Sequence, residues 1–303
     1  MSTTPYKHIE LKDNTVSFMD GDQRLSFERA TLPQAFLEWV KEGRRSMFDL
    51  LEGNGGKAGF FGSHLPVMVT CSRGNPVPFN TGNKGVGLVP VAGRINDYCA
   101  EYQRVFEDYA HRPWEESLAG RLECVRGFIN SEDVADNALV TLEIFENNTF
   151  RNLCDYPVAT LHYAGEGPVY MSYQINAVVE VAQPEHPAYN FAFLSRQLFE
   201  YDDFHITQTQ FPYAYIFHPI EVKDKTPFPR RLGVGRETPR EWNEMMLVWD
   251  DDVLEQLVRA PAMIQKMIIK FTEEYAREHG HNTVSLPIFN AVRTRYMKGG
   301  GQD

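Results

Sequence analysis

The sequence predicts an α+β protein, in which an antiparallel barrel or strongly curled sheet with added helices precedes a small all-α C-terminal module. Segments rich in β-branched and aromatic residues crowd the middle of the chain, and they do not alternate with helices as a parallel sheet requires. Apolar residues at helical spacing recur in the first third and again after residue 240. With 303 residues, 43% of them hydrophobic, the chain can bury one large core and a smaller one.

The first third of the chain, residues 1–118, combines short strands, helices and glycine-rich runs. Apolar residues near helical spacing, among them Phe36, Val40 and Phe48, predict a helix over 33–51. The other elements predicted here are strands over 8–11, 15–19 and 65–71 and a helix over 96–109.

Two glycine-rich runs, 53–62 and 80–87, flank the predicted strand at 65–71. Neither has the spacing of a P-loop, and in neither is the lysine followed by serine or threonine. Turns and hairpins are therefore favoured over phosphate binding for both runs.

Residues 119–232 are the β-rich part of the body. A helical pattern over 187–201 precedes the last strand. Strands are predicted over 122–128, 138–145, 159–163, 170–181 and 213–222.

A short motif lies between two of these strands. Residues 148–153 read Asn-Thr-Phe-Arg-Asn-Leu, and a Pro-Val pair at 157–158 opens the next strand. The run 137–162 resembles the strand, helical turn and strand of FMN-binding split barrels, the pyridoxamine-phosphate-oxidase-like proteins. The resemblance implies a split-barrel-like body and a flavin phosphate held by Thr149, Arg151 and Asn152. A turn of this kind can offer backbone N–H groups and an arginine fork to one phosphate.

A linker with proline, glycine and arginine separates the body from the C-terminal module. We expect an α+β body at 1–232, comprising a glycine-rich part at 1–118 and a split-barrel-like part at 119–232. The linker at 233–240 and the helical module at 241–303 follow.

Three helices are predicted in the module. Asp252 is placed at the N-cap of the first, with Glu255 completing a capping box. Pro261 opens the second, which Gly280 ends, and a third follows Ser285. The apolar stripe of the second helix, which is expected to be core more often than a docking surface, consists of Met263, Ile264, Met267, Ile268, Phe271 and Tyr275.

The module also has a family resemblance, carried by Trp249-Asp-Asp-Asp, Ala260-Pro261 and the run 275–280. It resembles the C-terminal domain of the light-independent protochlorophyllide reductase B subunit over about 249–297. In that family the module packs beside a tetrapyrrole pocket and supplies contacts instead of chemistry. The resemblance implies an association with tetrapyrrole or electron-transfer systems.

Two groups of side chains are candidates for chemistry. His205 and Asp203 lie on a loop after a predicted helix, where an imidazole beside a carboxylate could ligate haem iron or transfer a proton. The alternative is a solvated acidic loop. Tyr170, Tyr173, Tyr213 and Tyr215 alternate with other residues on two predicted strands and could line a flat cofactor, although such aromatic faces are more often core.

Composition excludes several classes of function. With 41 acidic and 30 basic residues, the net charge of −11 disfavours nucleic acid and membrane surfaces. No stretch approaches the roughly 20 apolar residues of a membrane span, and the N-terminus lacks a signal pattern, so we expect a cytoplasmic protein. The four cysteines lack ligand spacing, and His279 is interpreted as a helix-capping residue, so no metal site is predicted.

These patterns support two functional hypotheses. The first is an oxidoreductase or tetrapyrrole-modifying enzyme that binds FMN, haem or another tetrapyrrole. The second is a non-catalytic accessory protein that docks on a redox or pigment-synthesis complex through its C-terminal module. Both predict a homodimer or a complex with a redox partner.

Overall fold

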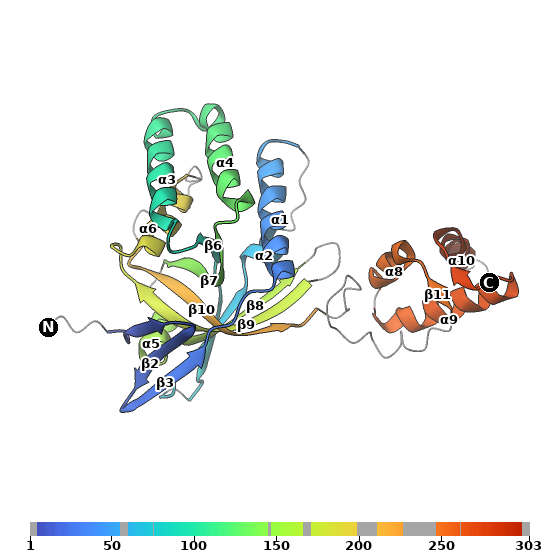
Figure 1. The fold of residues 1–303 in the computed structure, drawn as a ribbon, viewed down its shortest axis with the longest axis horizontal. Coiled ribbons are helices and arrows are strands. Elements are labelled where there is room, and N and C mark those ends of the chain that lie inside the picture. Colours follow the sequence, from blue (N-terminus) through green and yellow to red (C-terminus); the bar gives the residue numbers. More distant parts are fainter. Residues whose placement is uncertain are drawn as a thin grey trace. The chain divides into compact units, whose positions relative to one another are not determined.

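The computed structural model describes residues 5–54, 60–74, 76–144, 147–165, 171–198, 211–226, 247–260 and 262–298. The chain divides into two compact units, one of residues 1–165 with 172–225 and one of residues 166–171 with 226–303 (Figure 1).

The strands of the first unit are β1 (Ile9–Lys12), β2 (Thr15–Asp20), β3 (Gln23–Glu28), β4 (Val67–Cys71), β5 (Phe79–Asn83), β6 (Gly87–Pro90), β7 (Val134–Glu143), β8 (Val158–Gly165), β9 (Met171–Ala182) and β10 (Tyr213–Asp224). Its helices are α1 (Gln34–Leu51), α2 (Phe60–His64), α3 (Ile95–Tyr109), α4 (Trp114–Asn130), α5 (Asn148–Asp155) and α6 (Pro187–Gln197).

The main sheet has seven strands in the order β5-β4-β8-β9-β10-β7-β6, and its pairings are antiparallel. The two ends of this order, β5 and β6, are separated along the chain by residues 84–86 only. Because so short a segment spans at most about 14 Å, the two edges of the sheet must approach each other. The sheet therefore curls into a barrel that is split between β5 and β6.

Three side-chain contacts hold the chain at this split. The Lys84 ammonium donates to both carboxylate oxygens of Glu143 at 2.9 and 3.0 Å, and the Tyr215 hydroxyl donates to the same carboxylate at 2.6 Å. The Thr141 hydroxyl donates to the Gly85 carbonyl at 2.8 Å. These contacts hold the segment 84–86 against β7 and β10.

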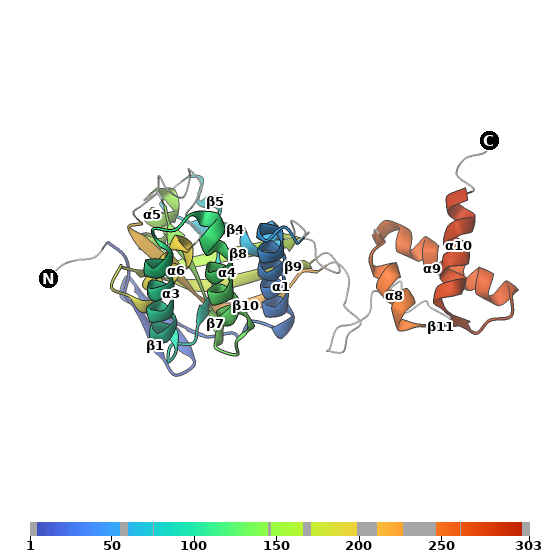
Figure 2. The same ribbon diagram turned by 90° about the horizontal axis from the view of Figure 1, so that it is seen from above.

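The helices α1, α3 and α4 stand on one side of the barrel and the β1-β2-β3 sheet lies on the other (Figures 1 and 2). The small sheet buries Ile9, Val16 and Phe18 against Val178 of β9. Helix α6 packs against α3 and against strands β6, β7 and β10.

The predicted strand at 122–128 is wrong, because these residues belong to α4. Its density of apolar residues is typical of a strand, but Arg121, Leu122, Val125 and Phe128 follow the spacing of one helical face, and all are buried. The helix begins after Pro113 with two glutamates in its first turn, which complement the helix dipole. The helix over 33–51 and the helix over 96–109 are confirmed as α1 and α3.

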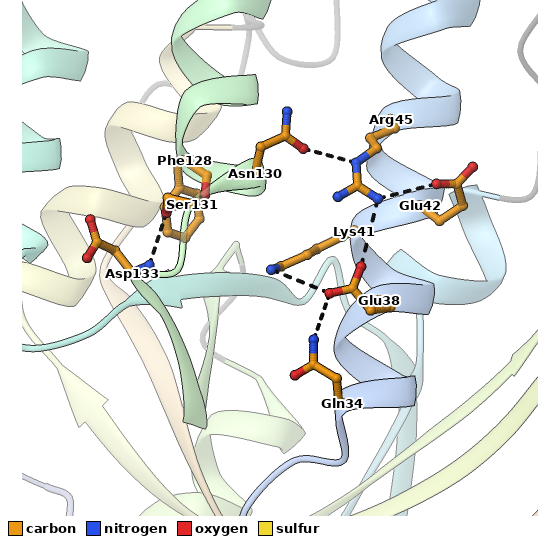
Figure 3. Close-up of polar contacts among 9 residues, drawn as sticks. All are labelled: Gln34, Glu38, Lys41, Glu42, Arg45, Phe128, Asn130, Ser131 and Asp133. Atoms are coloured by element: carbon orange, nitrogen blue, oxygen red, sulfur yellow. Dashed lines mark hydrogen bonds and ion pairs between the residues drawn. The ribbon is translucent and has the colours of Figure 1, made fainter. Parts of the chain in front are cut away.

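Polar side chains join the exposed parts of α1 and α4 (Figure 3). Arg45 donates through Nε to the Asn130 side chain at 3.0 Å, and its Nη1 lies near both Glu42 and Glu38. Such exposed contacts contribute little free energy each, so packing of the apolar helix faces holds α1 against α4.

Two glycines allow α2 and β8 to touch through their backbones. A Cβ atom on Gly165 would lie 2.5 Å from the Gly62 Cα, and one on Gly62 would lie 2.6 Å from the Gly165 Cα. Neither backbone can swing aside as a side chain can, so only glycine fits at both positions.

Replacing Gly165 with Ala is therefore expected to lower the free energy of unfolding by about 1–3 kcal/mol, the usual cost of overpacking. Chemical denaturation measures this loss. Gly127 of α4 is the matched control, since a methyl group at this position would meet no atom within 4 Å and alanine favours a helix. Equal effects of Gly165→Ala and Gly127→Ala would contradict the backbone contact.

The described residues of the second unit form three helices and one pair of very short parallel strands. Gly280 ends α9 with φ +74°, as predicted, and His281 donates its backbone N–H to the Ala276 carbonyl at 2.8 Å. The elements are β11 (Val248–Trp249), α8 (Asp251–Val258), α9 (Ala262–Glu278), β12 (Thr283–Val284) and α10 (Leu286–Lys298).

Two predictions for this unit need correction. The N-cap of α8 is Asp250, two residues before the predicted Asp252, because Asp250 is held by a backbone bond to Val284 of β12. The predicted apolar stripe of α9 is not its most buried face: Met267 is 50% exposed, whereas Ile269 and Ala276 enter the core. Glu273 is also buried on this helix.

That carboxylate organises the core of the second unit. Glu273 is 4% exposed and accepts from the Trp249 indole at 3.1 Å and from the Leu247 backbone at 3.0 Å. Arg277 donates to its other oxygen at 2.9 Å. The sequence predicted the helix and its apolar residues, but it did not predict this buried polar contact.

The predicted fold class is confirmed: an antiparallel, curled β body with added helices precedes a small helical module. No described helix is long and apolar enough to span a membrane.

Candidate cofactor-binding site

The structure brings three of the predicted site residues together on one short helix. Thr149, Arg151 and Asn152 all belong to α5, which follows β7 and precedes β8. His205, Asp203 and Tyr170 lie outside the described residues.

A hollow of about 330 Å³ lies beside α5. Its volume falls at the lower end of the range for small-molecule sites, about 300–1,000 Å³. Both α5 and the segment from the end of β4 into β5 contribute to it. The lining residues are Ser72, Val77, Phe79, Asn80, Asn148, Arg151 and Asn152.

Two side-chain hydrogen bonds fix the wall of the hollow. The Asn80 amide donates to the Thr149 hydroxyl at 3.1 Å, and the Asn152 amide donates to the Thr70 hydroxyl at 3.1 Å. Thr149 and Asn152 are buried, so these bonds hold α5 against the β4–β5 hairpin. Thr149 therefore positions the lining residue Asn80 and does not itself line the hollow.

The inner side of this helix is also anchored. The Phe150 ring stacks on the Tyr213 ring of β10 with centroids 4.8 Å apart and planes 6° from parallel. Because Phe150 points into the protein, its neighbours Asn148 and Arg151 are presented to the hollow.

The electrostatics of the hollow favour an anion. Arg151 is exposed, and across the described part of the chain it forms no ion pair with a carboxylate. Asn148 is the first residue of α5, where backbone N–H groups and the helix dipole attract negative charge. A guanidinium beside a helix N-terminus can bind a phosphate or carboxylate through bidentate hydrogen bonds.

Another arginine borders the site but is already engaged. The Arg73 guanidinium contacts Asp20 at 2.5 Å and lies 4.2 Å from the centre of the Tyr156 ring. Hydrogen bonds from Lys7 and from Arg73 hold the pKa of Asp20 below its usual range. Arg73 thus ties the β1-β2-β3 sheet to the rim of the site.

The sequence missed the half of the hollow that comes from the β4–β5 hairpin, including Ser72, Phe79 and Asn80. Phe79 is 67% exposed, which is unusual for a large aromatic side chain beside a polar hollow. The signal available was the glycine-rich run 80–87, for which turns and hairpins were favoured over phosphate binding. Most of β5, the second strand of the β4–β5 hairpin, and the first residue of β6 lie in this run.

Tyr173 lies apart from the residues on α5. It is almost fully buried on β9, with its ring 5.2 Å from Phe36 and 6.2 Å from Trp39 of α1. Tyr173 is thus part of the aromatic core, which was the alternative to a cofactor-lining role for the alternating tyrosines.

Metal binding finds no geometric basis in the described residues, where no three His, Cys, Asp or Glu side chains are grouped as ligands. The four cysteines are free. His279 donates from Nδ1 to the Tyr275 carbonyl at 2.8 Å, as a capping residue at a helix C-terminus does.

Comparisons with known proteins yield only distant likenesses. No protein-family model and no curated protein matches the chain. A crystal structure of HupZ from Group A Streptococcus is 13% identical, with a TM-score of 0.30, over 64% of this chain and 98% of that chain. An FMN-binding protein from Syntrophomonas wolfei is 7% identical, with a TM-score of 0.33, over 66% of this chain and 89% of the other. Likenesses of this strength assign no function to the chain.

Proposed function

We propose that this protein binds a flat, conjugated redox cofactor with an anionic end, FMN in the first instance, at the hollow beside α5. The carrying observation is that Arg151 and the first residue of α5 face a hollow bordered by an exposed aromatic ring, Phe79. The cationic side would bind the phosphate, and the ring would offer a stacking surface. Bound flavin supplies electron or hydride transfer.

A tetrapyrrole is the alternative cofactor, because its propionate groups offer the same anionic chemistry to Arg151. The absorption spectrum of the protein purified from its native host separates the two cases. Flavin absorbs at about 450 nm, whereas a tetrapyrrole gives a Soret band. A colourless protein that takes up neither ligand would overturn the proposal.

The role of Arg151 can be tested directly. Replacing it with Ala is expected to weaken FMN binding by about tenfold or more, because a charge-assisted hydrogen bond contributes about 1.5–3 kcal/mol. Quenching of flavin fluorescence on titration measures the dissociation constant. Arg104→Ala is the control, since Arg104 is an exposed arginine of α3 that pairs with Asp108. Equal affinities of the two variants would refute the site.

As part of this proposal, His205 and Asp203 would transfer a proton at the bound cofactor, an assignment made from the sequence alone. Either cofactor is compatible with a homodimer or a redox complex. His205→Ala is therefore expected to keep cofactor affinity and to lose turnover.

A second candidate function is supported by the exposed side of α9. Met267 is half exposed between the exposed side chains of Lys266 and Lys270, within the stretch that resembles the protochlorophyllide reductase module. We infer that this chain is a non-catalytic accessory protein, which docks on a redox or pigment-synthesis complex through this side of its C-terminal module. Loss of a co-purifying partner in Met267→Glu, with the spectrum unchanged, would support this function over the first.

A further inference from the structure

Glu180 of β9 lies at the centre of a group of histidines that the proposed cofactor site does not use. His218 of β10 approaches it with Nε2 3.1 Å from one carboxylate oxygen, and His186 approaches with Nε2 3.9 Å from the other. His8, from the N-terminal segment, also interacts with this carboxylate. The group thus joins strands β9 and β10, the start of α6 and the chain before β1.

His186 is the N-cap of α6, and its ring caps the helix directly. The Ala188 backbone N–H donates to His186 Nδ1 at 3.1 Å, so this nitrogen must carry a lone pair and no proton. In the neutral ring the proton therefore resides on Nε2, which faces Glu180.

In the neutral ring of His218 the proton also resides on Nε2, although for a different reason. Its side chain is 4% exposed, with Nε2 beside Glu180, while Nδ1 is buried and has no hydrogen-bond partner among the described residues. A proton added at Nδ1 would create a buried N–H group without an acceptor, which is costly.

In both rings the second proton must therefore enter at Nδ1, where the fold opposes it. At His186 it removes the helix cap and places a positive charge at the positive end of the helix dipole. We propose that the start of α6 is a pH-sensitive switch, in which protonation of His186 and His218 around Glu180 opens the first turn of the helix.

The charge on Glu180 does not change in the same pH range. Burial raises the pKa of this carboxyl, but the hydrogen bond from His218 and the neighbouring imidazoles outweigh burial, and the pKa lies below its usual range. A depressed carboxyl pKa contributes stability that is lost only below its unfolded value of about 4.3. Protonation of Glu180 therefore does not drive a change between about pH 7.5 and 5.5.

The remaining titratable groups near the cluster do not supply an alternative sensor. In the turn before α6, Glu185 interacts with Tyr6 of the N-terminal segment. A carboxyl and a phenol ordinarily titrate well outside this window. When all three imidazoles carry a proton, the charge of the group changes from −1 to +2, so electrostatic repulsion adds to the loss of the cap.

Hydrogen exchange of the peptide covering α6 tests the switch in the intact chain. After correction for intrinsic exchange, the wild type is expected to lose about fivefold in protection between pH 7.5 and 5.5, the size of a lost N-cap. His186→Asn keeps a cap acceptor that does not titrate, so its loss should stay below about twofold. His186→Ser offers the same test if the first variant folds poorly.

His111→Asn is the matched control, because His111 is exposed in the turn between α3 and α4. It should lose protection as the wild type does. Glu180→Gln, which removes the central charge but keeps the shape, should move the loss to lower pH, because the imidazoles lose the carboxylate that favours their charged form. Constant protection in the wild type, or a loss in His186→Asn equal to that of the wild type, would overturn the switch.

Discussion

Replacing Lys84 with Met is expected to lower the free energy of unfolding by about 3–5 kcal/mol, the usual cost of removing one partner from a buried ion pair. The Glu143 side chain is 1% exposed, and the Lys84 ammonium lies 2.9 Å from its carboxylate. Without the ammonium group, this carboxylate would stay buried and lose the charge that balances it. The lost ion pair also lies at the split of the barrel, where the segment 84–86 connects the two edges of the sheet.

Urea or guanidinium denaturation followed by circular dichroism measures this effect. Lys223→Met is the matched control, because Lys223 forms an ion pair of similar length with Glu221 at an exposed position. That substitution should cost less than about 1 kcal/mol. The double variant Lys84→Met with Glu143→Leu should recover much of the stability, since no charge is then left buried. Equal losses in the two Lys→Met variants would show that the buried pair has no special role.

Replacing Arg121 with Met is expected to lower the free energy of unfolding by about 2–4 kcal/mol, because one buried and one part-buried carbonyl group would lose a charged donor. Arg121 of α4 is 7% exposed and donates to the Leu198 carbonyl at 2.9 Å and to the Tyr109 carbonyl at 3.1 Å. These two carbonyls belong to the C-terminal ends of α6 and α3, where a positive charge also suits the helix dipole. A third bond, from Nε to the Ser117 hydroxyl at 3.0 Å, fixes the side chain along α4.

Burial lowers the pKa of Arg121, but an arginine remains charged at any pH of interest. Arg121→Lys should restore little stability, because one ammonium group cannot reach three acceptors that a planar fork contacts. The control is Arg104→Met, on exposed α3 surface, with an expected change within about 0.5 kcal/mol. A thermal midpoint of Arg121→Met equal to that of Arg104→Met would exclude the role assigned to this side chain.

The candidate site was partly visible in the sequence because half of it is local. Arg151, Asn152 and Asn148 lie within five residues of one another, and a short helical turn necessarily brings them together. The other half comes from the β4–β5 hairpin, and its Asn80 bonds with Thr149 across 69 positions of the chain. No periodicity of a single segment predicts contacts of that range.

Three features followed from the sequence by itself: the α+β class, the glycine C-cap of α9, and the helices with regular apolar spacing, such as α1 and α3. These features depend on the backbone conformation of neighbouring residues. Tertiary structure alone decided that residues 122–128 are helix, that the 79–90 segment closes the barrel, and which face of α9 enters the core. In each of these cases several local conformations were acceptable, and burial of apolar area together with partners for Glu143, Arg121 and Glu273 selected one of them.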